Sequence, residues 1–414
     1  MYVRSLILEN FKCFGSASLE LHYPGKKGSD VPEFDNVNLV LGDNGGGKSS
    51  VLRALAIAML APALPGAGFV ATRLVRRVRP GVPMVAHADL TADGWRPPGE
   101  TIPRAGRRQA YKLRTRIRIS QSGPDKLVPF DTDEDKSFAD ALDDDQSNAI
   151  FVAGYSATRF VEPGKFVASS ALKSRSLRYQ RVAGLFEDNV TLSPMQSWLP
   201  QLHARSAEAH ARAINLINSV LPSNIRFSGE HDDRDEQYVF EFNGLRTPFG
   251  SLSDGYKAFV GWIGDLVGRL AEVAKPRQPF TDIPGLVLVD EIDLHLHPEW
   301  QRTVVPELAK AFPNIQFVLT SHSPLVAASL RKENIFVTGS REDGTASIDQ
   351  FQEKVYGRSS EQLLLSSYFG LTNTRPDTFQ DESRELFQRA ARGDASAALD
   401  YLKKLSGTVP ETGE

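Results

Sequence analysis

The sequence contains a single cysteine, Cys13, among its 414 residues. One cysteine excludes an internal disulfide framework and any zinc site that needs several thiolates. Disulfide-rich secreted proteins and zinc-ribbon proteins are therefore ruled out as classes. This scarcity fits a reducing compartment, and the cytoplasm is the location that we expect.

Long apolar runs are also absent. The longest apolar stretch, around residues 54–65, is interrupted by prolines and falls short of the roughly 20 residues that cross a bilayer as a helix. The opening 14 residues mix polar and apolar side chains and lack the apolar core of a signal peptide. We therefore expect no membrane span and no export, which argues against a transporter.

The sequence has no excess of basic charge. It carries 48 Lys and Arg against 51 Asp and Glu, a net charge of -3, so no global attraction draws it to nucleic acid. The distribution is uneven, because residues 131–145 are mostly acidic and are predicted to form a loop. Basic residues gather in the region before this loop, and two interpretations fit them: contact with DNA phosphates, or a solvated strand face whose arginines pair with the acidic loop. These basic residues are Arg73, Arg76, Arg77, Arg79, Arg104, Arg107, Arg108, Lys112, Arg114, Arg116 and Arg118.

What the sequence does contain is an alternation of apolar strands with amphipathic helices. Such an alternation predicts an α/β fold with a largely parallel core sheet. Residues 111–119, YKLRTRIRI, alternate with period two, so we expect a half-exposed strand with its arginines outward. The other predicted strands are 2–8, 37–41, 149–154, 238–242, 285–289, 315–320 and 334–337, and the main predicted helices are 194–220, 255–273 and 298–312.

Residues 42–49, GDNGGGKS, fit the phosphate-loop pattern G-x-x-x-x-G-K-[ST] and lie between a predicted strand and a predicted helix. Glycines let backbone N–H groups turn toward phosphates, and the start of the helix adds its positive end. Lys48 is predicted to reach the β and γ phosphates and Ser49 to ligate Mg²⁺. The alternative is a glycine-rich turn that binds nothing. The predicted nucleotide contacts are Asn44, Gly45, Gly46, Gly47, Lys48, Ser49 and Ser50.

Four apolar residues, 286–289, are followed by Asp290 and Glu291. An apolar strand that ends in two acids is the pattern of a Walker B segment. Asp290 is predicted to hold the Mg²⁺ shell, and Glu291 to orient and polarise the attacking water. Two adjacent carboxylates also occur in solvated turns, which is the alternative interpretation.

His322 follows the predicted strand 315–320, in the run Thr320-Ser321-His322-Ser323. This position beside the predicted active site favours a switch residue that contacts the γ phosphate, although a lone histidine is more often structural. Ser253 and Gly255 stand at the start of the predicted helix 255–273 and offer a serine cap, a close backbone approach and free amides for phosphate. Taken alone, this second motif is an ordinary helix cap.

In the order phosphate loop, Ser253 motif, Walker B and histidine, these motifs resemble the ABC ATPase heads of the SMC and RecF class. The Ser253 motif is similar to the signature Leu-Ser-Gly-Gly-Gln, and the match covers roughly residues 1–60 and 250–337. The resemblance implies an α/β P-loop NTPase, an ABC head with a mixed or parallel core sheet, N-terminal antiparallel strands and an inserted helical and β region. The implied domains are a core of residues 1–65 and 245–345, an inserted arm at 66–244, and a C-terminal helical region at 346–414 with a frayed tail.

The same resemblance implies ATP and Mg²⁺ as cofactors and ATP hydrolysis as the reaction. In that class two heads sandwich two ATP molecules, so Ser253 and Gly255 would act on the nucleotide of the second subunit of a homodimer or higher oligomer. Residues 10–14, NFKCF, match the family's opening Asn-Phe-Lys/Arg-x-Phe, which places Lys12 near the nucleotide.

The chain departs from the family pattern in two places. The signature continues Ser-Asp-Gly-Tyr without a glutamine, and the usual D-loop gives way to residues 293–298, DLHLHP. The second stretch, with His295 and His297 beside carboxylates, also fits a metal site, but we favour a D-loop that contacts the second subunit. Residues 155–159 are the best candidate for the Q-loop, with a plain turn at the end of a strand as the alternative.

The stretch 290–298 is similar to the Asp-Glu-x-x-x-His-Leu-His-Pro segment of RecF-class ATPases found in anti-phage systems and in overcoming-lysogenization-defect nucleases. Residues 356–376 resemble the C-terminal part of Septu-type and retron-associated defence ATPases. We see no acidic cluster typical of a Toprim nuclease, so we expect the effector, a nuclease or toxin, to be a separate protein encoded nearby.

The favoured function is therefore an ATPase that dimerises on ATP, senses DNA or a phage component, and regulates that effector in prokaryotic defence. One alternative is a RecF-like ATPase of DNA repair and recombination that binds DNA directly. Another is a nucleotide-locked scaffold with negligible turnover. Glu291 argues against the scaffold, because a scaffold has no need of an acid that polarises water.

Overall fold

The structure of the chain is a computed structural model. It describes residues 1–28, 31–77, 85–97, 110–120, 123–129, 140–143, 149–159, 175–188, 190–232, 234, 236–375 and 377–406. The tail 407–414, most of the acidic stretch 131–145, and Arg79, Arg104, Arg107 and Arg108 lie outside these residues. No helix in the described ranges is both long and apolar enough to cross a membrane.

A six-stranded sheet lies at the centre of the fold, in the order β14-β13-β3-β12-β11-β7. Every neighbouring pair is parallel except β13 with β14, as the alternation of strands and helices predicted. All residues of β7, β11 and β12 are buried, which explains why these segments are mostly apolar. The strands are β3 (Val37–Gly42), β7 (Phe151–Tyr155), β11 (Gly285–Val289), β12 (Ile315–Thr320), β13 (Ile335–Ser340) and β14 (Ala346–Asp349).

The pairing register brings the carboxyl ends of four strands to one edge of this sheet. Val289 at the end of β11 lies beside Leu319 of β12 and Tyr155 of β7, and Thr320 lies beside Val40 of β3. The segments that follow these strands therefore emerge together. In open α/β sheets, this is the edge at which ligands bind.

A second, antiparallel sheet has the order β2-β1-β4-β5-β6. Helix α1 (Lys48–Leu60) packs against strands of both sheets, and 11 of its 13 residues are buried. A helix covered on all sides has no polar stripe, so the apolar run in this part of the sequence belongs to a core helix. The strands are β1 (Tyr2–Glu9), β2 (Ser16–Glu20), β4 (His87–Trp95), β5 (Ala110–Arg118) and β6 (Lys126–Pro129).

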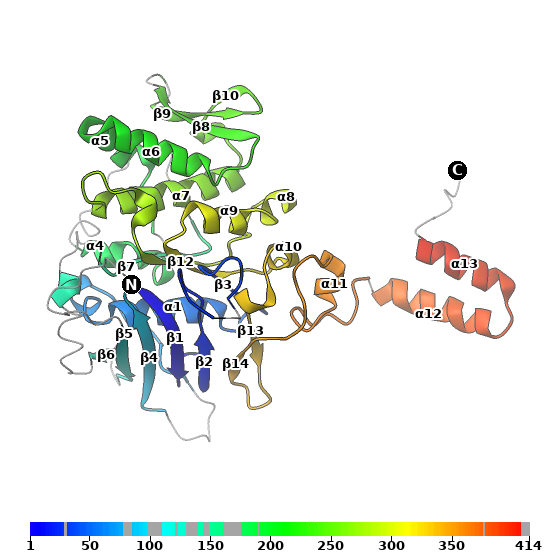
Figure 1. The fold of residues 1–414 in the computed structure, drawn as a ribbon. Helices are drawn as coiled ribbons and strands as arrows, with labels where there is room; N and C mark the ends of the chain where they lie inside the picture. The colour runs from blue at the N-terminus through cyan, green and yellow to red at the C-terminus, as the bar shows by residue number, and fades with distance from the viewer. Residues whose placement is uncertain are drawn as a thin grey trace. The chain divides into compact units, whose positions relative to one another are not determined.

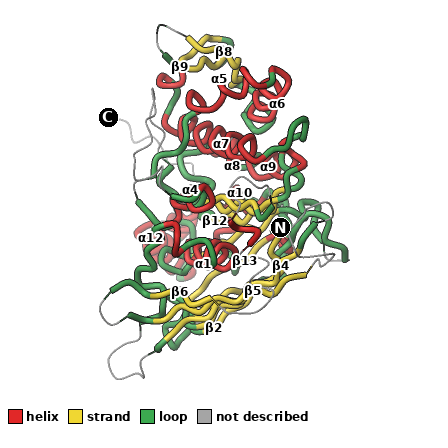
Figure 2. The backbone as a smooth tube through the Cα atoms, turned by 90° about the vertical axis from the view of Figure 1, so that its left-hand side faces the viewer, coloured by secondary structure: helices red, strands yellow, loops and turns green. Residues whose placement is uncertain are grey.

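A lobe of helices and a small sheet lies on the other side of the central sheet, opposite the antiparallel sheet (Figures 1 and 2). Its strands are β8 (Ile225–Asp232), β9 (Gln237–Phe242) and β10 (Leu245–Pro248), paired in the order β10-β9-β8. Its helices α5 (Met195–Arg205) and α6 (Ala207–Asn218) pack on α7 (Asp254–Val273). Ser206 separates α5 from α6 because it is extended, and its hydroxyl caps α6, so the helical region predicted at 194–220 is two helices.

Short helices complete the main unit. They are α4 (Leu177–Gln180), α8 (Pro298–Gln301), α9 (Val304–Ala311) and α10 (Pro324–Ala328). The single helix predicted at 298–312 was therefore wrong, because the chain leaves α8 at Arg302 and starts again after Thr303.

The chain divides into two compact units, Met1–Ser360 and Glu361–Glu414. Helix α11 (Ser360–Leu364) begins at the division, and the second unit contains α12 (Asp377–Ala391) and α13 (Ala395–Ser406). The span 66–244, expected to be an inserted arm, supplies β4, β5 and β6 to the antiparallel sheet and β7 to the central one. Part of that span is thus built into both sheets.

Candidate functional site

The phosphate loop connects β3 to α1 and needs glycine at two positions. At Gly42, with φ 140°, a Cβ atom would lie 2.4 Å from the Thr338 carbonyl oxygen. At Gly47, with φ 101°, it would lie 2.7 Å from Cys13 Sγ and 2.7 Å from the Phe14 ring. The loop is therefore pressed against β13 and against the segment after β1, and any larger residue would displace it.

No side chain caps the first turn of α1, whose N-cap position is Gly47. The first N–H groups of a helix have no partner within it, so they are available to an anion, and the helix dipole favours one. Asn44 and Gly45 are exposed on the loop ahead of this turn, whereas Ser50 is buried within it. The loop thus combines free amides with an exposed approach, as phosphate binding requires.

Lys48 lies among acids at the start of α1. Its Nζ donates to the Gly42 carbonyl at 2.9 Å and the Asp43 carbonyl at 3.0 Å. Burial lowers the pKa of this lysine, and the nearby carboxylates of Asp290 and Glu291 act in the opposite direction. The structure therefore brings the phosphate-loop lysine and the two acids predicted as Walker B into one electrostatic environment.

Thr320 at the end of β12 positions both acids. Its hydroxyl donates to Asp290 Oδ1 at 2.6 Å and accepts the backbone N–H of Glu291 at 2.7 Å. The Asp290 N–H donates in turn to the Tyr155 carbonyl on β7 at 2.8 Å. One threonine thus fixes the carboxylate of the first acid and the backbone of the second. The sequence placed Thr320 at the end of a strand, but did not show that β12 is next to β11.

We expect Thr320→Val to lower the free energy of unfolding by about 1–3 kcal/mol, because it leaves the half-buried Glu291 N–H and an oxygen of the buried Asp290 carboxylate without their partner. Urea denaturation measures this change. Thr115→Val is a matched control, since Thr115 is also buried in a strand but lies in the antiparallel sheet. ATP turnover should fall only for Thr320→Val, and an equal loss in both variants would contradict the positioning role.

His322 is exposed at the carboxyl end of β12, between the strands that carry the phosphate loop and the acids. Its neighbour Ser323 caps α10, accepting the N–H groups of Leu325 and Val326. The Ser323 hydroxyl also donates to Gln301 Oε1 at 2.6 Å, and Gln301 Nε2 donates to the Leu296 carbonyl at 2.9 Å. The backbone around His322 is therefore tied to the segment that follows the two acids, and its switch role stays a prediction.

Ser253 occupies the N-cap position of α7, but its side chain makes no capping hydrogen bond. The predicted serine cap is therefore wrong, and the exposed Ser253 stands at an uncapped helix start. The predicted close approach at Gly255 is confirmed, because a Cβ atom there would lie 2.3 Å from the His295 carbonyl oxygen. The signature-like motif and the D-loop-like segment are consequently in contact.

A groove of about 1010 Å³ opens beside this contact, between the start of α7, the segment 295–297 and residues 221–224 of the lobe. His297 has a structural part in its wall, because its Nδ1 accepts the Glu299 N–H at the start of α8. Among the described residues no group of three or more His, Cys, Asp or Glu could hold a metal ion. The two histidines thus belong to the groove and the cap of α8.

The oxygen atoms predicted to bind Mg²⁺ belong to residues of two elements. Ser49 lies in the first turn of α1, and the Asp290 carboxylate lies at the end of β11 with one oxygen held by Thr320. Hydroxyl and carboxylate oxygens are the ligands that Mg²⁺ takes, usually beside phosphate and water. These residues therefore fit a nucleotide-bound Mg²⁺, and their roles as ligands stay predictions.

Lys12 precedes Cys13, a residue that packs against the phosphate loop. Cys13 adjoins Gly47, and the Lys12 backbone, with φ 50°, donates to the Leu74 carbonyl at 2.8 Å. Burial lowers the pKa of Lys12, and the positive charge of Arg53 on α1 lowers it further. Two cations therefore lie near each other beside α1, where the resemblance places Lys12 near the nucleotide.

The basic strand β5 is partly neutralised by its own sheet. Arg116 makes two hydrogen bonds to Asp89 of β4, both at 2.7 Å, and the register sets Lys112 opposite Asp93. Arg77 pairs with Asp125 at 3.0 Å. The partners expected from the acidic stretch 131–145 lie mostly outside the described residues, and the partners found here come from elsewhere in the chain.

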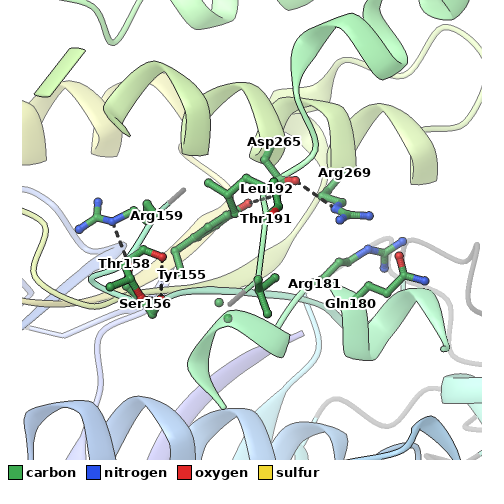
Figure 3. A pocket seen from close by; sticks show the side chains of 13 residues that line it. Tyr155, Ser156, Thr158, Arg159, Gln180, Arg181, Thr191, Leu192, Asp265 and Arg269 are labelled. Carbon is green, nitrogen blue, oxygen red and sulfur yellow. Dashed lines mark hydrogen bonds and ion pairs between the residues drawn. The ribbon is translucent and has the colours of Figure 1, made fainter. Parts of the chain in front are cut away.

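The turn after β7, the candidate Q-loop, lies directly beside the two acids. Arg159 in this turn donates to the backbone carbonyls of Asp290 and Glu291. A cavity of about 20 Å³ lies behind the turn (Figure 3). This is room for about one water molecule, so the cavity is too small for a nucleotide.

Two family models match the chain. The model described as "AAA domain, putative AbiEii toxin, Type IV TA system" matches residues 37–328, and one described as "AAA domain" matches residues 5–67. The first match takes in the phosphate loop, Ser253, both acids and His322. It covers well over half of the chain and every motif around the candidate site except Lys12.

Curated relatives match over different lengths. The Septu protein PtuA of Bacillus mycoides (strain KBAB4) is 25% identical over 396 residues, which is 94% of this chain and 47% of that protein. The Retron Ec83 probable ATPase of Escherichia coli is 44% identical over 170 residues, 40% of this chain and 31% of that protein. The Retron Vc95 probable ATPase of Vibrio cholerae is 43% identical over 93 residues, which is 22% of this chain and 18% of that protein. The chain thus spans less than half of the length of these relatives.

Among solved structures, the SmcHead bound to the C-winged helix domain of ScpA is similar, with a TM-score of 0.51 and 14% identity over 85% of this chain and 98% of that one. Similarity at this level of identity shows the fold alone. The fold is that of an SMC-head P-loop ATPase with a mixed central sheet and N-terminal antiparallel strands, which confirms the predicted fold class.

Proposed function

The chain belongs to the AAA-domain family whose model matches residues 37–328, and we propose that it binds ATP with Mg²⁺, dimerises around the nucleotide and hydrolyses it. The observation that carries the proposal is the meeting of Lys48, Asp290 and Glu291 at one edge of the central sheet. Two of these residues lie about 240 positions from the third in the sequence. The meeting of a cation and two acids beside an uncapped helix start is the arrangement that phosphoryl transfer requires.

The residues divide the chemistry among them. The first-turn amides of α1 and the Lys48 ammonium bind the phosphates, and Ser49 and Asp290 hold the ion that neutralises charge on them. Glu291 orients the attacking water and accepts its proton. His322 follows β12, the strand between β3 and β11, and it contacts the γ phosphate and reports whether this phosphate is present.

A second copy of the chain completes the site in this proposal. Helix α7 starts with an exposed, uncapped Ser253, so its first N–H groups and the serine hydroxyl are free to meet the phosphates of another subunit. The contact between Gly255 and His295 places the D-loop-like segment next to this helix start. The two motifs would therefore approach the second subunit together.

Light scattering tests the dimer. We expect Ser253→Arg to bind ATP as wild type does but to stay monomeric with ATP and Mg²⁺, because the larger cation blocks the approach of the second head. Ser16→Arg is the control, since Ser16 is also exposed but lies on β2 of the antiparallel sheet. If Ser253→Arg dimerises with ATP as fully as the control, the role of Ser253 in the second subunit's site is wrong.

The biological role that we propose is control of an effector protein in anti-phage defence. It is supported by relatives named as a Septu protein and as retron ATPases. The ATP cycle of the head would switch a separate nuclease or toxin, and assembly in the cytoplasm would let the pair meet. Direct DNA binding is less well supported, because Arg116 and Arg77 are paired within the chain.

A further inference from the structure

We propose that Arg159 is a positioning residue for ATP hydrolysis, which holds the backbone of Glu291 so that its carboxylate faces the attacking water. This inference rests on the proposed function. Arg159 does not touch the nucleotide in this proposal. It acts through the peptide groups on either side of Glu291.

The guanidinium of Arg159 bonds to three backbone carbonyls. Its Nε donates to the Ser156 carbonyl at 3.1 Å, within the turn after β7. Its Nη2 donates to the Asp290 carbonyl at 2.7 Å and also to the Glu291 carbonyl. Because β7 is the neighbour of β11 in the sheet, the turn after one strand reaches the acids after the other.

Glu291 needs such support because its backbone is in the left-handed region, with φ 49°. This conformation costs a residue with a side chain about 1–2 kcal/mol, and it persists only where surrounding contacts determine it. Thr320 accepts the Glu291 N–H at 2.7 Å, and Arg159 donates to the Glu291 carbonyl. Thr320 of β12 and Arg159 in the turn after β7 therefore hold both polar groups of the Glu291 backbone. The Glu291 carbonyl also accepts the Leu294 N–H at 3.1 Å, and the carboxylate is left for catalysis.

Arg159 remains charged at neutral pH in this position. Burial lowers its pKa to about 10, while the carboxylates of Asp290, Asp293 and Glu291 act to raise it. A guanidinium offers several N–H donors in a fixed plane, whereas a lysine ammonium is a compact point charge. Only the arginine can therefore bond the two peptide carbonyls and the turn at the same time.

Helix α7 braces the turn that carries Arg159. The Arg159 guanidinium carbon lies 6.0 Å from the ring centre of Trp262. The ring centres of Tyr155 and Trp262 are 5.4 Å apart. The Tyr155 hydroxyl donates to Asp265 on the same helix at 2.9 Å, and Figure 3 shows Tyr155 pointing to Asp265. The hydrogen bonds of Arg159 to the backbone carbonyls of Asp290 and Glu291 form a clamp on this backbone. Helix α7, whose N-cap residue is Ser253, supports the clamp on one side.

The test compares Arg159→Lys and Arg159→Gln with wild type in steady-state ATP hydrolysis. We expect kcat to fall about 10- to 100-fold, because a misplaced catalytic group costs rate. KM and the ATP affinity should change less than about threefold, because ground-state binding does not use the clamp. A rise in KM with unchanged kcat, or wild-type kcat in Arg159→Lys, would overturn the inference.

Arg178→Lys is the matched control. Arg178 is a buried arginine that likewise donates to backbone carbonyls, those of Ala141, Leu142, Ala149 and Ile150, but at the other end of β7. We expect this variant to lower Tm while keeping kcat. An equal loss of kcat in the two lysine variants would show a merely structural effect and would sink the positioning role.

Amide hydrogen exchange provides a readout that does not need turnover. In Arg159→Gln, the amides of Glu291 and Ile292 should exchange at least about tenfold faster than in wild type, because the clamp no longer holds their peptides. Unchanged exchange there would overturn the inference even if hydrolysis falls. If wild type hydrolyses no ATP, the proposed function fails, and this exchange measurement still decides whether Arg159 holds the acid.

Discussion

The Glu291→Gln variant is expected to hydrolyse ATP about 100- to 1000-fold more slowly than wild type, within the range that a general base contributes. The backbone contacts of Glu291 with Thr320 and Arg159 involve its N–H and C=O groups, so an amide side chain leaves them in place. The change removes only the group that accepts a proton from water. ATP affinity should therefore stay near the wild-type value.

This separation of binding from turnover is measured by phosphate release and by calorimetric titration with ATP and Mg²⁺. A slow variant should also accumulate the ATP-bound dimer, so its solution mass should double with ATP. Glu299→Gln is the control, since Glu299 is an exposed acid in α8. Hydrolysis by Glu291→Gln within threefold of wild type would remove Glu291 from the reaction and return the choice to His322 or another base.

The Lys48→Ala variant is expected to bind ATP about 100-fold more weakly. Losing a charged hydrogen-bond donor costs about 1.5–3 kcal/mol, and about 2.8 kcal/mol corresponds to a 100-fold change in Kd. The loss has a second cause here, because Asp290 and Glu291 lie near Lys48 and would repel the phosphates without it. Hydrolysis and ATP-dependent dimerisation should both disappear at ATP concentrations that saturate wild type.

Calorimetric titration and light scattering on the same samples measure these losses. Lys310→Ala is the control, since Lys310 is an exposed lysine of α9 that pairs with Glu307 at 3.4 Å. Because Lys48→Ala removes binding and Glu291→Gln removes turnover, the two variants should differ in mass with ATP. ATP binding by Lys48→Ala as tight as that of wild type would mean that the glycine-rich loop is not the nucleotide site.

The sequence predicted best where function is carried by a continuous run of residues. The strands 285–289 and 315–320 match β11 and β12 residue for residue, because their apolar runs are bounded by turn residues on both sides. The phosphate loop was visible for the same reason, since its glycines and Lys48 lie within eight positions. Local chemistry of this kind needs no knowledge of which strands are neighbours.

The partners of Asp290 and Glu291 could not be predicted, because they depend on the order of strands in the sheet. Thr320 and Arg159 reach Asp290 and Glu291 only because β12 and β7 flank β11. Spacing in the sequence gives no sign of this order. By sequence, residues 155–159 fit a Q-loop or a plain turn, and only the structure shows the hydrogen bonds of Arg159 to the backbone of Asp290 and Glu291.

Other misses have different physical causes. Strand β4 was not predicted, because its segment follows a Pro- and Gly-rich stretch and gains its stability from pairing with β1 and β5. The prediction of a capping hydrogen bond from Ser253 was wrong. A serine indicates the N-cap position of a helix, but the residue type does not show which way its hydroxyl points. Gly255 was interpreted correctly, since a missing side chain itself indicates a close backbone approach.

The enclosure of α1 between two sheets gives the molecule a mechanical property. A helix with one solvent-exposed face can shift relative to the sheet that supports it. A helix packed on all sides moves together with its neighbours, so a movement of either sheet is transmitted to its N-terminus. The tip of α1 is the phosphate loop. A displacement of the antiparallel sheet, on the far side of the main unit from the lobe, would therefore move α1 and with it the phosphate loop, and a displacement of the loop would move the sheet in turn.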